Sequence, residues 1–431
     1  MIGIRHEDKS LWESRVPVIP DDVRSLIRDH GVGFCVQRSP TRVFSDAEFA
    51  TAGATLADDV AECPIVMGVK EIPPGKLLPN RTYVFFSHVI KGQPANMPML
   101  RRLIELKCQL IDYERIVDGE GRRLVFFGRF AGLAGMIDTL WALGQRWRYE
   151  GVENPFAEVR HAYQYNNIEH AKSDIADVGR RIQQHGLPEA CRPLICGLAG
   201  YGQVSQGAQE IYDLLPVETV SPGELATVPL SANACFKVVF HEKHMVERID
   251  ASSPFKLQEY YDHPKLYRGR FYTHLPHLTV LVNGIYWEPK YPRLVTRELL
   301  RDLYGQNDRP RLRVIGDISC DIEGSVECTI RTMEPDNPVF VYEPDTGRTR
   351  DGVAGDGPVV LAVDHLPCEL PVDSSTYFSQ SLKSFIPALA RADFSRSLAD
   401  SGLPPELIRA TIVYHGALTG PYRHLEQFVK G

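Results

Sequence analysis

An apolar run that passes into a glycine-rich turn constrains this chain more than any other feature. Pro193–Cys196 predicts a buried strand, Gly197, Gly200 and Gly202 follow it, and Ser205–Leu215 has the spacing of an amphipathic helix. A buried strand joined to a helix through glycines is typical of an α/β unit with a parallel sheet. Bare backbone at such a turn can approach an anion, because the helix begins with unpaired N–H groups.

The glycine pattern departs from the dinucleotide-binding sequence GxGxxG. Ser205 stands at the third glycine, and Gly207 comes two residues later. The alternative is a tight strand–helix turn without a ligand. A second α/β unit precedes the turn, however, and this favours a dinucleotide site. The predicted cofactor-binding residues are Gly200, Tyr201, Gly202, Gln203 and Val204.

A ribose-binding acid is expected at the end of the following strand. Glu218 in Pro216–Val220 is the candidate near that point. Its carboxylate would favour NAD over NADP by repelling a 2′-phosphate. The alternative is a solvated strand residue, so the cofactor is predicted only as NADP or NAD.

Composition excludes several classes of protein. A chain of 431 residues favours two domains with a cleft, and 43% hydrophobic with 24% charged residues is a globular balance. A net charge of -7 makes nucleic acid and anionic membranes poor partners. The first residues contain no apolar stretch suited to a signal peptide or a membrane span, so we expect a cytoplasmic protein. The nine scattered cysteines form no CxxC pair, and His241–His244 is one residue short of HExxH, so we predict no metal site.

Short β-rich runs alternate with helical patterns up to about residue 130 and predict a first α/β unit. The expected strands are Ile2–Arg5, Phe34–Gln37, Ile65–Val69, Thr82–Ser87, Gln109–Asp112 and Leu124–Gly128. The expected helices of this unit are Asp21–Asp29, Ser45–Ala50 and Met97–Lys107. Further along, helices are expected at Gly132–Arg148, Asn167–His185, Ser375–Ala390 and Pro405–Tyr414, a strand at Leu312–Ile318, and a mobile excursion at Glu343–Gly357.

Two titratable residues follow adjacent strands of this first unit. Lys70 comes just after Ile65–Val69, and His88 just after Thr82–Ser87. Active sites of open α/β sheets gather at the carboxyl ends of their strands, so the two side chains could transfer protons there. A solvated lysine and a structural histidine are the alternatives.

Arginines and an aspartate are candidates for holding a substrate. Arg15 and the pair Arg122 and Arg123 could each clamp a carboxylate through a bidentate guanidinium, the alternative being surface salt bridges. Asp317 ends an apolar strand, where it could bind an amine or a ribose, the alternative being a turn-forming aspartate.

Several longer strings resemble the lysine-ketoglutarate reductase family, in the family's order and over nearly the whole chain. They are Ile4–Lys9 with Trp12–Pro17, Phe85–Lys91 with Asn96–Pro98, Leu110–Glu114, Gly200–Glu210, Asn283–Trp287 with Tyr291–Leu294, and Gly316–Ser325.

The resemblance implies an α/β fold akin to alanine dehydrogenase. It would have two Rossmann-like domains with parallel sheets separated by a cleft, and a C-terminal segment returning to the first domain. Residues 1–135 with 335–431 would form the substrate and catalytic domain, and residues 136–334 the dinucleotide-binding domain. Lys70 and His88 match the family's acid–base groups. The implied substrate-binding residues are Arg15, Glu71, Glu114, Arg122, Arg123 and Asp317, and Asp317 is also implied in cofactor binding.

The activity that the resemblance implies is the NAD(P)-dependent condensation of L-lysine with 2-oxoglutarate to saccharopine, or the reverse, as the first step of lysine degradation. Bifunctional members of the family are fused to a second dehydrogenase, so we expect a separate glutamate-forming saccharopine dehydrogenase as a partner. Whether the chain forms a homo-oligomer stays open. The alternatives are an opine-type or alanine-type dehydrogenase with another amine or oxo acid, and a catalytically silent metabolite-binding module.

Overall fold

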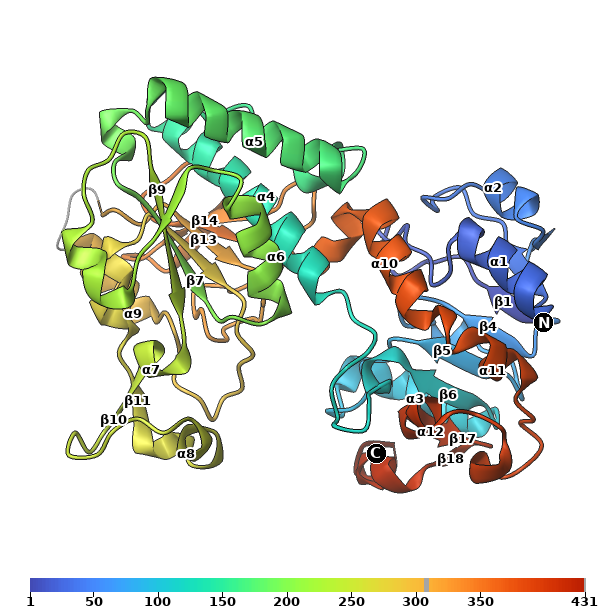
Figure 1. The fold of residues 1–431 in the computed structure, drawn as a ribbon. Helices are drawn as coiled ribbons and strands as arrows, with labels where there is room; N and C mark the ends of the chain where they lie inside the picture. Colours follow the sequence, from blue (N-terminus) through green and yellow to red (C-terminus); the bar gives the residue numbers. More distant parts are fainter. Residues whose placement is uncertain (306–309, 430–431) are drawn as a thin grey trace. The chain divides into compact units, whose positions relative to one another are not determined.

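The computed structural model describes residues 1–305 and 310–429. The chain divides into two compact units. Unit 1 combines residues 1–127 with residues 371–431, and unit 2 comprises residues 128–370. The blue and red segments of Figure 1 therefore belong to one unit, which is built from both ends of the chain.

The described residues of unit 1 form an eight-stranded sheet with the order β18-β17-β6-β5-β4-β1-β2-β3. Its strands are β1 (Ile2–Ile4), β2 (Phe34–Gln37), β3 (Thr55–Ala57), β4 (Ile65–Met67), β5 (Thr82–Phe85), β6 (Gln109–Asp112), β17 (Thr411–Tyr414) and β18 (Ala417–Leu418). The strands from β1 to β6 are parallel, and β17 adds to β6 in antiparallel orientation. The carboxyl ends of β1, β4, β5 and β6 therefore meet at one edge.

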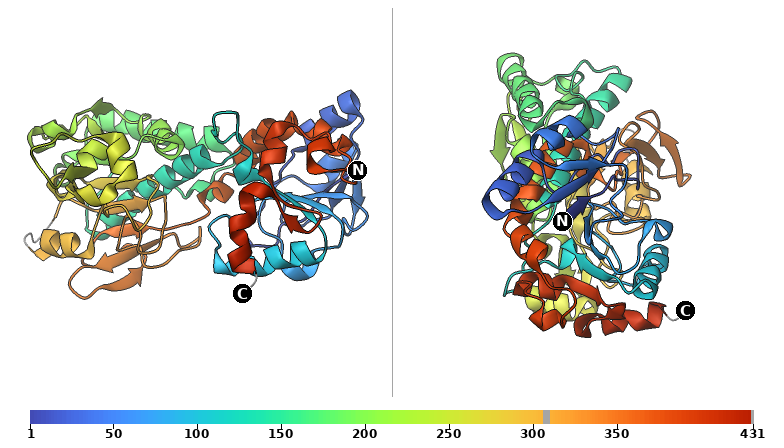
Figure 2. Two further views of the ribbon diagram at one scale, coloured as in Figure 1. Left: turned by 90° about the horizontal axis from the view of Figure 1, so that it is seen from below. Right: turned by 90° about the vertical axis from the view of Figure 1, so that its right-hand side faces the viewer.

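Helices cover this sheet on both faces, with α1 and α10 on one side and α3 on the other (Figure 1). The helices of unit 1 are α1 (Pro20–His30), α2 (Asp46–Thr51), α3 (Met97–Glu105), α10 (Pro371–Lys383), α11 (Ile386–Arg391), α12 (Pro405–Ala410) and α13 (Glu426–Val429). The sequence explains the bounds of α1, because Pro20 starts it and Gly31 ends it at a positive φ of 64°. The C-terminal helix α13 lies along α3 (Figure 2).

The described residues of unit 2 form a second eight-stranded sheet, with the order β15-β14-β16-β13-β12-β7-β9-β8. Its strands are β7 (Leu194–Ala199), β8 (Val217–Thr219), β9 (Cys235–Phe240), β12 (Val280–Asn283), β13 (Val314–Asp317), β14 (Val339–Glu343), β15 (Arg348–Asp351) and β16 (Val359–Leu361). Its long helices are α4 (Gly128–Tyr149), α5 (Ile168–His185), α6 (Gln203–Tyr212) and α9 (Arg297–Gly305). A small excursion comprises α7 (Glu242–Met245), β10 (Val246–Arg248), α8 (Leu257–Asp262) and β11 (Tyr267–Gly269).

Glycines let α4 and α6 pack backbone against backbone. A Cβ at Gly132 would lie 1.9 Å from the Val204 carbonyl oxygen, and one at Gly207 would lie 2.1 Å from the Arg129 carbonyl oxygen. Neither position tolerates a side chain. The contact explains why the glycine of α6 stands at residue 207 rather than 205: it serves the packing of two helices.

The structural boundary between the units differs from the predicted one. Residues 335–370 were expected in the first domain, but they supply β14, β15 and β16 to the unit 2 sheet. The cause is pairing, because β16 runs parallel to β13 and β14 pairs with β16 through the buried Val339–Val341. Only the chain from Pro371 returns to unit 1, where Ser375 and Ser379 accept hydrogen bonds from the backbone of the segment before α1.

Other sequence-based elements also need correction. Leu124–Gly128 is not a strand, and the predicted excursion at Glu343–Gly357 contains β15 and the turn that joins it to β14. The predicted helix at Pro405–Tyr414 ends at Ala410 and continues as β17.

Candidate active site and cofactor site

Lys70 and His88 lie at neighbouring strand ends of unit 1, as their positions in the sequence predict. The backbone N–H of Phe86 donates to the Val69 carbonyl at 3.1 Å, so the segments that follow β4 and β5 remain paired beyond the strands. Lys70 follows directly in one segment, and His88 two residues later in the other. His88 has a positive φ of 47°, which a histidine adopts only where its surroundings fix it.

Glu71 holds the His88 ring. His88 Nδ1 lies 2.7 Å from Glu71 Oε1, and the Lys9 ammonium lies 3.8 Å from Oε2. Burial alone would raise the pKa of Glu71, but the hydrogen bond and the charge of His88 outweigh it and lower that pKa to about 2. Glu71 is therefore ionised at neutral pH. Because Nδ1 faces this carboxylate, Nε2 is the ring atom left to exchange a proton with another group.

Arg15 is buried and already holds a carboxylate of the chain. Its Nε lies 2.7 Å from Glu13 Oε1, its Nη2 contacts Glu13 Oε2, and its guanidinium lies over the Phe127 ring at 4.3 Å. Burial would raise the pKa of Glu13, but Arg15 lowers it further than burial raises it, and the charge of Lys70 adds to that effect. A substrate carboxylate at Arg15 would therefore share the guanidinium with Glu13.

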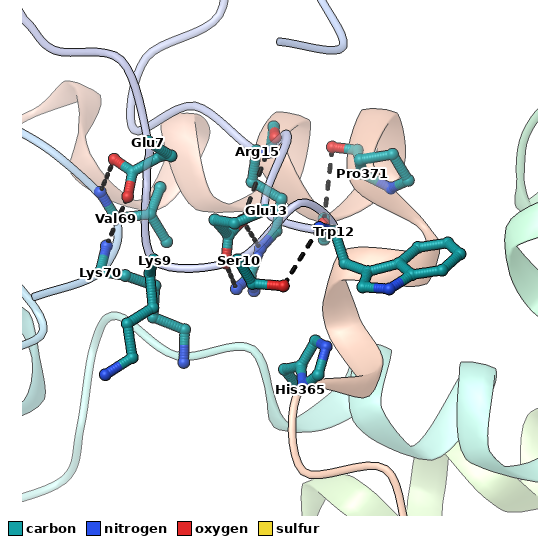
Figure 3. Close-up of polar contacts among 12 residues, drawn as sticks. Glu7, Lys9, Ser10, Trp12, Glu13, Arg15, Val69, Lys70, His365 and Pro371 are labelled. Carbon is teal, nitrogen blue, oxygen red and sulfur yellow. Dashed lines mark hydrogen bonds and ion pairs between the residues drawn. The ribbon is translucent and has the colours of Figure 1, made fainter. Parts of the chain in front are cut away.

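Two buried carboxylates that sequence reasoning did not single out also lie at this edge. Glu7 accepts hydrogen bonds from the backbone N–H groups of Val69 and Lys70, as the dashed lines of Figure 3 show. Asp112, at the end of β6, accepts from the backbone N–H and the hydroxyl of Ser87, the residue before His88. Their positions just after β1 and at the end of β6 are the signal that could have identified them.

The other substrate-binding candidates of unit 1 differ in placement. Arg122 lies on an exposed turn, where it pairs with Asp118 at 2.7 Å and with Glu120 at 3.0 Å, so the structure favours the surface salt bridge. Arg123 is exposed. Glu114 follows β6, and its backbone N–H donates to Asp112 at 2.8 Å, which places it at the carboxyl edge with Lys70 and His88.

In unit 2 the glycine turn has the features that a pyrophosphate requires. Gly200 has a φ of +96°, and a Cβ at Gly202 would meet no atom within 4 Å. Gly202 caps the ten-residue helix α6 without a side-chain hydrogen bond, so Gln203 and Val204 begin a helix whose terminal N–H groups have no side-chain cap. A dinucleotide phosphate would complete this helix end.

The acid beside this turn is Glu242 rather than Glu218. Glu218 is exposed on β8, the edge strand, whereas the strand paired with β7 is β9. Glu242 follows β9 directly, and its carboxylate accepts hydrogen bonds from the hydroxyls of Tyr201 and Tyr261. The sequence suggested Glu218 because β8 comes first along the chain. The pairing of β9 with β7 could not be inferred from residue order.

Asp317 is satisfied within unit 2. It is 1% exposed, and its carboxylate accepts from Asn283 at 2.7 Å, from the Cys320 N–H at 3.2 Å and from Thr329 at 2.5 Å. Burial raises its pKa to about 6. These contacts join the ends of β12 and β13, so the buried Asp317 carboxylate fixes the two strand ends relative to each other.

The residues that the structure describes contain no group of three or more His, Cys, Asp and Glu side chains placed to hold a metal ion. None of their helices combines the length and the apolar character needed to cross a membrane.

Comparisons with known proteins identify relatives over the full chain. It is 34% identical to the mitochondrial alpha-aminoadipic semialdehyde synthase of Bos taurus, over 99% of this chain and 48% of that protein. It is 35% identical to the alpha-aminoadipic semialdehyde synthase of Arabidopsis thaliana, over 100% of this chain and 42% of that protein. The chain thus spans about half the length of these relatives. It is also 28% identical to the L-lysine-forming, NAD(+) saccharopine dehydrogenase of Neurospora crassa, over 89% of both chains.

The fold matches that of a solved L-alanine dehydrogenase with a TM-score of 0.64, at 16% identity and over 99% of both chains. Residues 3–134 match the family model of the alanine dehydrogenase/PNT N-terminal domain. These matches confirm the predicted two-domain α/β fold and the resemblance in the sequence. Over its full length the chain is therefore similar to about half the length of each of these alpha-aminoadipic semialdehyde synthases, and it is similar to an L-lysine-forming saccharopine dehydrogenase, with residues 3–134 matching the alanine dehydrogenase/PNT N-terminal domain.

Proposed function

We propose that this chain catalyses the NAD(P)-dependent reductive condensation of L-lysine with 2-oxoglutarate to saccharopine, or the reverse reaction. The observation that carries the proposal is the carboxyl edge of unit 1. There Glu71 fixes His88, and Lys70 follows the adjacent strand in a chain homologous to proteins named for lysine-forming saccharopine dehydrogenation.

The side chains of unit 1 suit the proton transfers of this reaction. The ε-amine of lysine must be neutral to attack the keto carbon of 2-oxoglutarate, so a base must take its proton. His88 Nε2 is suited to this step, because Glu71 faces Nδ1 and stabilises the imidazolium that forms. The Lys70 ammonium would then donate a proton to the hydroxyl group of the resulting carbinolamine, and that group leaves as water.

Unit 2 fits a bound dinucleotide. The turn at Gly200–Gly202 and the first N–H groups of α6 would hold the pyrophosphate, and Glu242 would accept hydrogen bonds from a ribose. When bound, NADH or NADPH would supply the hydride that reduces the carbon–nitrogen double bond. The residues of the turn contribute binding and orientation only.

The test is a rate measurement with a choice of amines. Oxidation of NADH and of NADPH is followed with 2-oxoglutarate and, in turn, L-lysine, L-ornithine, L-alanine and ammonia. We expect lysine to give the highest kcat/KM and mass spectrometry to identify saccharopine as the product. Equal rates with every amine would contradict the proposed substrate.

Two other activities stay as alternatives. A preference for another amine or oxo acid would indicate an opine-type or alanine-type dehydrogenase. Calorimetric binding of a dinucleotide without turnover for any pair would indicate a silent metabolite-binding module. The ordered pair of Glu71 and His88 favours catalysis over silent binding, because an ionised partner for a histidine ring serves proton transfer.

The cellular setting is part of the proposal. We infer a cytoplasmic enzyme that passes saccharopine to a separate glutamate-forming saccharopine dehydrogenase. Cell fractionation tests the location, and a coupled assay with the second enzyme tests the sequence of reactions. Release of saccharopine into solution before the second step is the expected result.

A further inference from the structure

Glu7 lies where the chain leaves β1 and enters the carboxyl edge of unit 1. It is 6% exposed, so its carboxylate is almost wholly removed from water. Oε1 accepts from the Val69 N–H at 2.7 Å, and Oε2 accepts from the Lys70 N–H at 3.1 Å. One carboxylate thus binds two consecutive backbone N–H groups, and the second belongs to the predicted proton-transfer lysine (Figure 3).

The surrounding residues make room for this contact. A Cβ at Gly68 would lie 2.9 Å from Glu7 Oε1, so a side chain there would displace the carboxylate. On the other side of the same segment, the Val69 carbonyl accepts from the Phe86 N–H. The backbone at residues 69 and 70 is therefore held through its N–H groups by Glu7 and through a carbonyl by the segment that leads to His88.

Charged and titratable groups surround Glu7 from several segments. Arg5 Nη1 lies 3.8 Å from Oε2, and Glu13, Arg42 and the buried Tyr113 interact with it electrostatically. Burial raises the pKa of Glu7 to about 7, the largest influence, against the opposing effects of Arg5 and the two N–H groups. Glu7 therefore changes charge near neutral pH.

We propose that Glu7 is a positioning residue for Lys70, and that full turnover requires the carboxylate form that binds both N–H groups. A carboxylate offers an acceptor oxygen to each N–H. A protonated carboxyl keeps one good acceptor, and its hydroxyl serves the second N–H poorly. Protonation therefore loosens the backbone from which the Lys70 side chain extends. The inference rests on the proposed function, in which Lys70 transfers protons.

The test compares two glutamates that both accept a hydrogen bond from a backbone N–H. Glu7→Gln keeps the shape but replaces one acceptor by an NH2 group. Glu48→Gln makes the same change at the exposed capping box of α2, where Glu48 binds the Ser45 N–H. We expect Glu7→Gln to lower kcat by about tenfold or more, since small misplacements of a reacting group have such effects, with KM values nearly unchanged. Glu48→Gln should leave kcat unchanged.

The pH profile separates positioning from a general loss of structure. In the natural protein kcat should rise with pH through an acid limb near pH 7, because ionisation of Glu7 restores both hydrogen bonds. Glu7→Gln should lack the contribution of Glu7 to that limb. A variant with natural kcat and the same limb would overturn the proposal.

Amide hydrogen exchange gives a readout independent of turnover. The N–H groups of Val69 and Lys70 should exchange faster in Glu7→Gln, and faster in the natural protein below pH 7 than above it after correction for intrinsic rates. If Glu7→Gln fails to fold, exchange is measured on Glu7→Asp instead, and the pH dependence of exchange in the natural protein tests the proposal by itself. Unchanged exchange across pH 7 would contradict the role of Glu7. A natural protein without activity on lysine and 2-oxoglutarate would instead contradict the proposed function.

Discussion

The carboxyl edges of the two sheets differ in the chemical groups that they present. In unit 1 the edge is lined by ionic side chains that pair with one another, such as the buried Glu13 with Arg15 and the half-buried Glu71 with His88. In unit 2 the turn that follows β7 presents bare backbone at Gly200 and Gly202. Proton transfer needs side chains with fixed orientation, whereas a phosphate needs close N–H groups. Under the proposed function, the same sheet geometry would support both tasks through the choice of residues at the strand ends.

Removal of the side chains at the unit 1 edge should have the largest effect. His88→Asn and Lys70→Met should each lower kcat by about a hundredfold, the usual size of an acid–base contribution. Dinucleotide affinity, measured by fluorescence titration, should stay within about twofold, because the backbone turn of unit 2 is untouched. His30→Asn, on the exposed end of α1, is the control. A loss of dinucleotide binding in His88→Asn would contradict the assignment of proton transfer to unit 1 and dinucleotide binding to unit 2.

A side chain introduced into the turn of unit 2 should, in contrast, weaken dinucleotide binding. Gly200→Ala forces a Cβ onto a φ of +96° and 3.2 Å from Ile285 Cγ2. The free turn would relax from this strain of about 1–2 kcal/mol, and binding of the dinucleotide would have to restore the strained conformation. That cost corresponds to roughly tenfold weaker dinucleotide binding. Gly119→Ala, where a Cβ meets nothing within 4 Å, should bind normally. Equal affinities in the two variants would show that the turn is not the cofactor site.

Glu242 should influence the choice between NAD and NADP by a smaller factor. Glu242→Gln removes the charge beside the turn, and we expect the affinity for NADPH relative to NADH to rise by about threefold to tenfold, the range of one exposed electrostatic contact. Glu218→Gln, on the edge strand, should change neither affinity. The reverse outcome, with Glu218 controlling the ratio, would restore the assignment made from residue order.

A buried acid in the interior of unit 2 should make the stability of the protein depend on pH. Burial, followed by the neighbouring Asp138, raises the pKa of Glu369 far above its usual range, so the folded protein keeps a proton that the unfolded chain releases above about pH 4.5. Stability must therefore fall as pH rises from 4.5 towards the folded pKa, by up to about 1.4 kcal/mol per pH unit.

Glu369→Gln should remove this decline. Compared with the natural protein, the variant should therefore lose less stability between pH 5 and pH 8. Thermal unfolding at the two values measures it, with the exposed Glu62→Gln as the control. An unchanged slope in Glu369→Gln would mean that Glu369 does not keep its proton in the folded protein.

The sequence predicted local elements well and the pairing of distant ones poorly. β2 and β6 match the expected bounds, and α1, α4 and α5 lie within a few residues of them, because each shows its own apolar spacing. The returning segment was placed too early, since β14 and β16 look like generic apolar runs until their partner β13 is known.

The candidate site shows the same limit. Lys70 and His88 could be placed because residues after parallel strands gather at one edge. Glu7, Asp112 and Glu242 act through contacts with backbone or side chains far along the chain, and those contacts depend on strand order. Asp317 and Arg122 were candidates for binding a substrate, but the structure pairs their side chains with other residues of the chain. Those partners could not be identified from the sequence.

The most direct test of the account is product analysis in single-turnover reactions. The natural protein, mixed with NADH or NADPH, L-lysine and 2-oxoglutarate, should form saccharopine in proportion to the nucleotide oxidised. His88→Asn should bind the nucleotide and form almost none. Absence of saccharopine from the natural protein with both nucleotides, or undiminished formation by His88→Asn, would contradict the account.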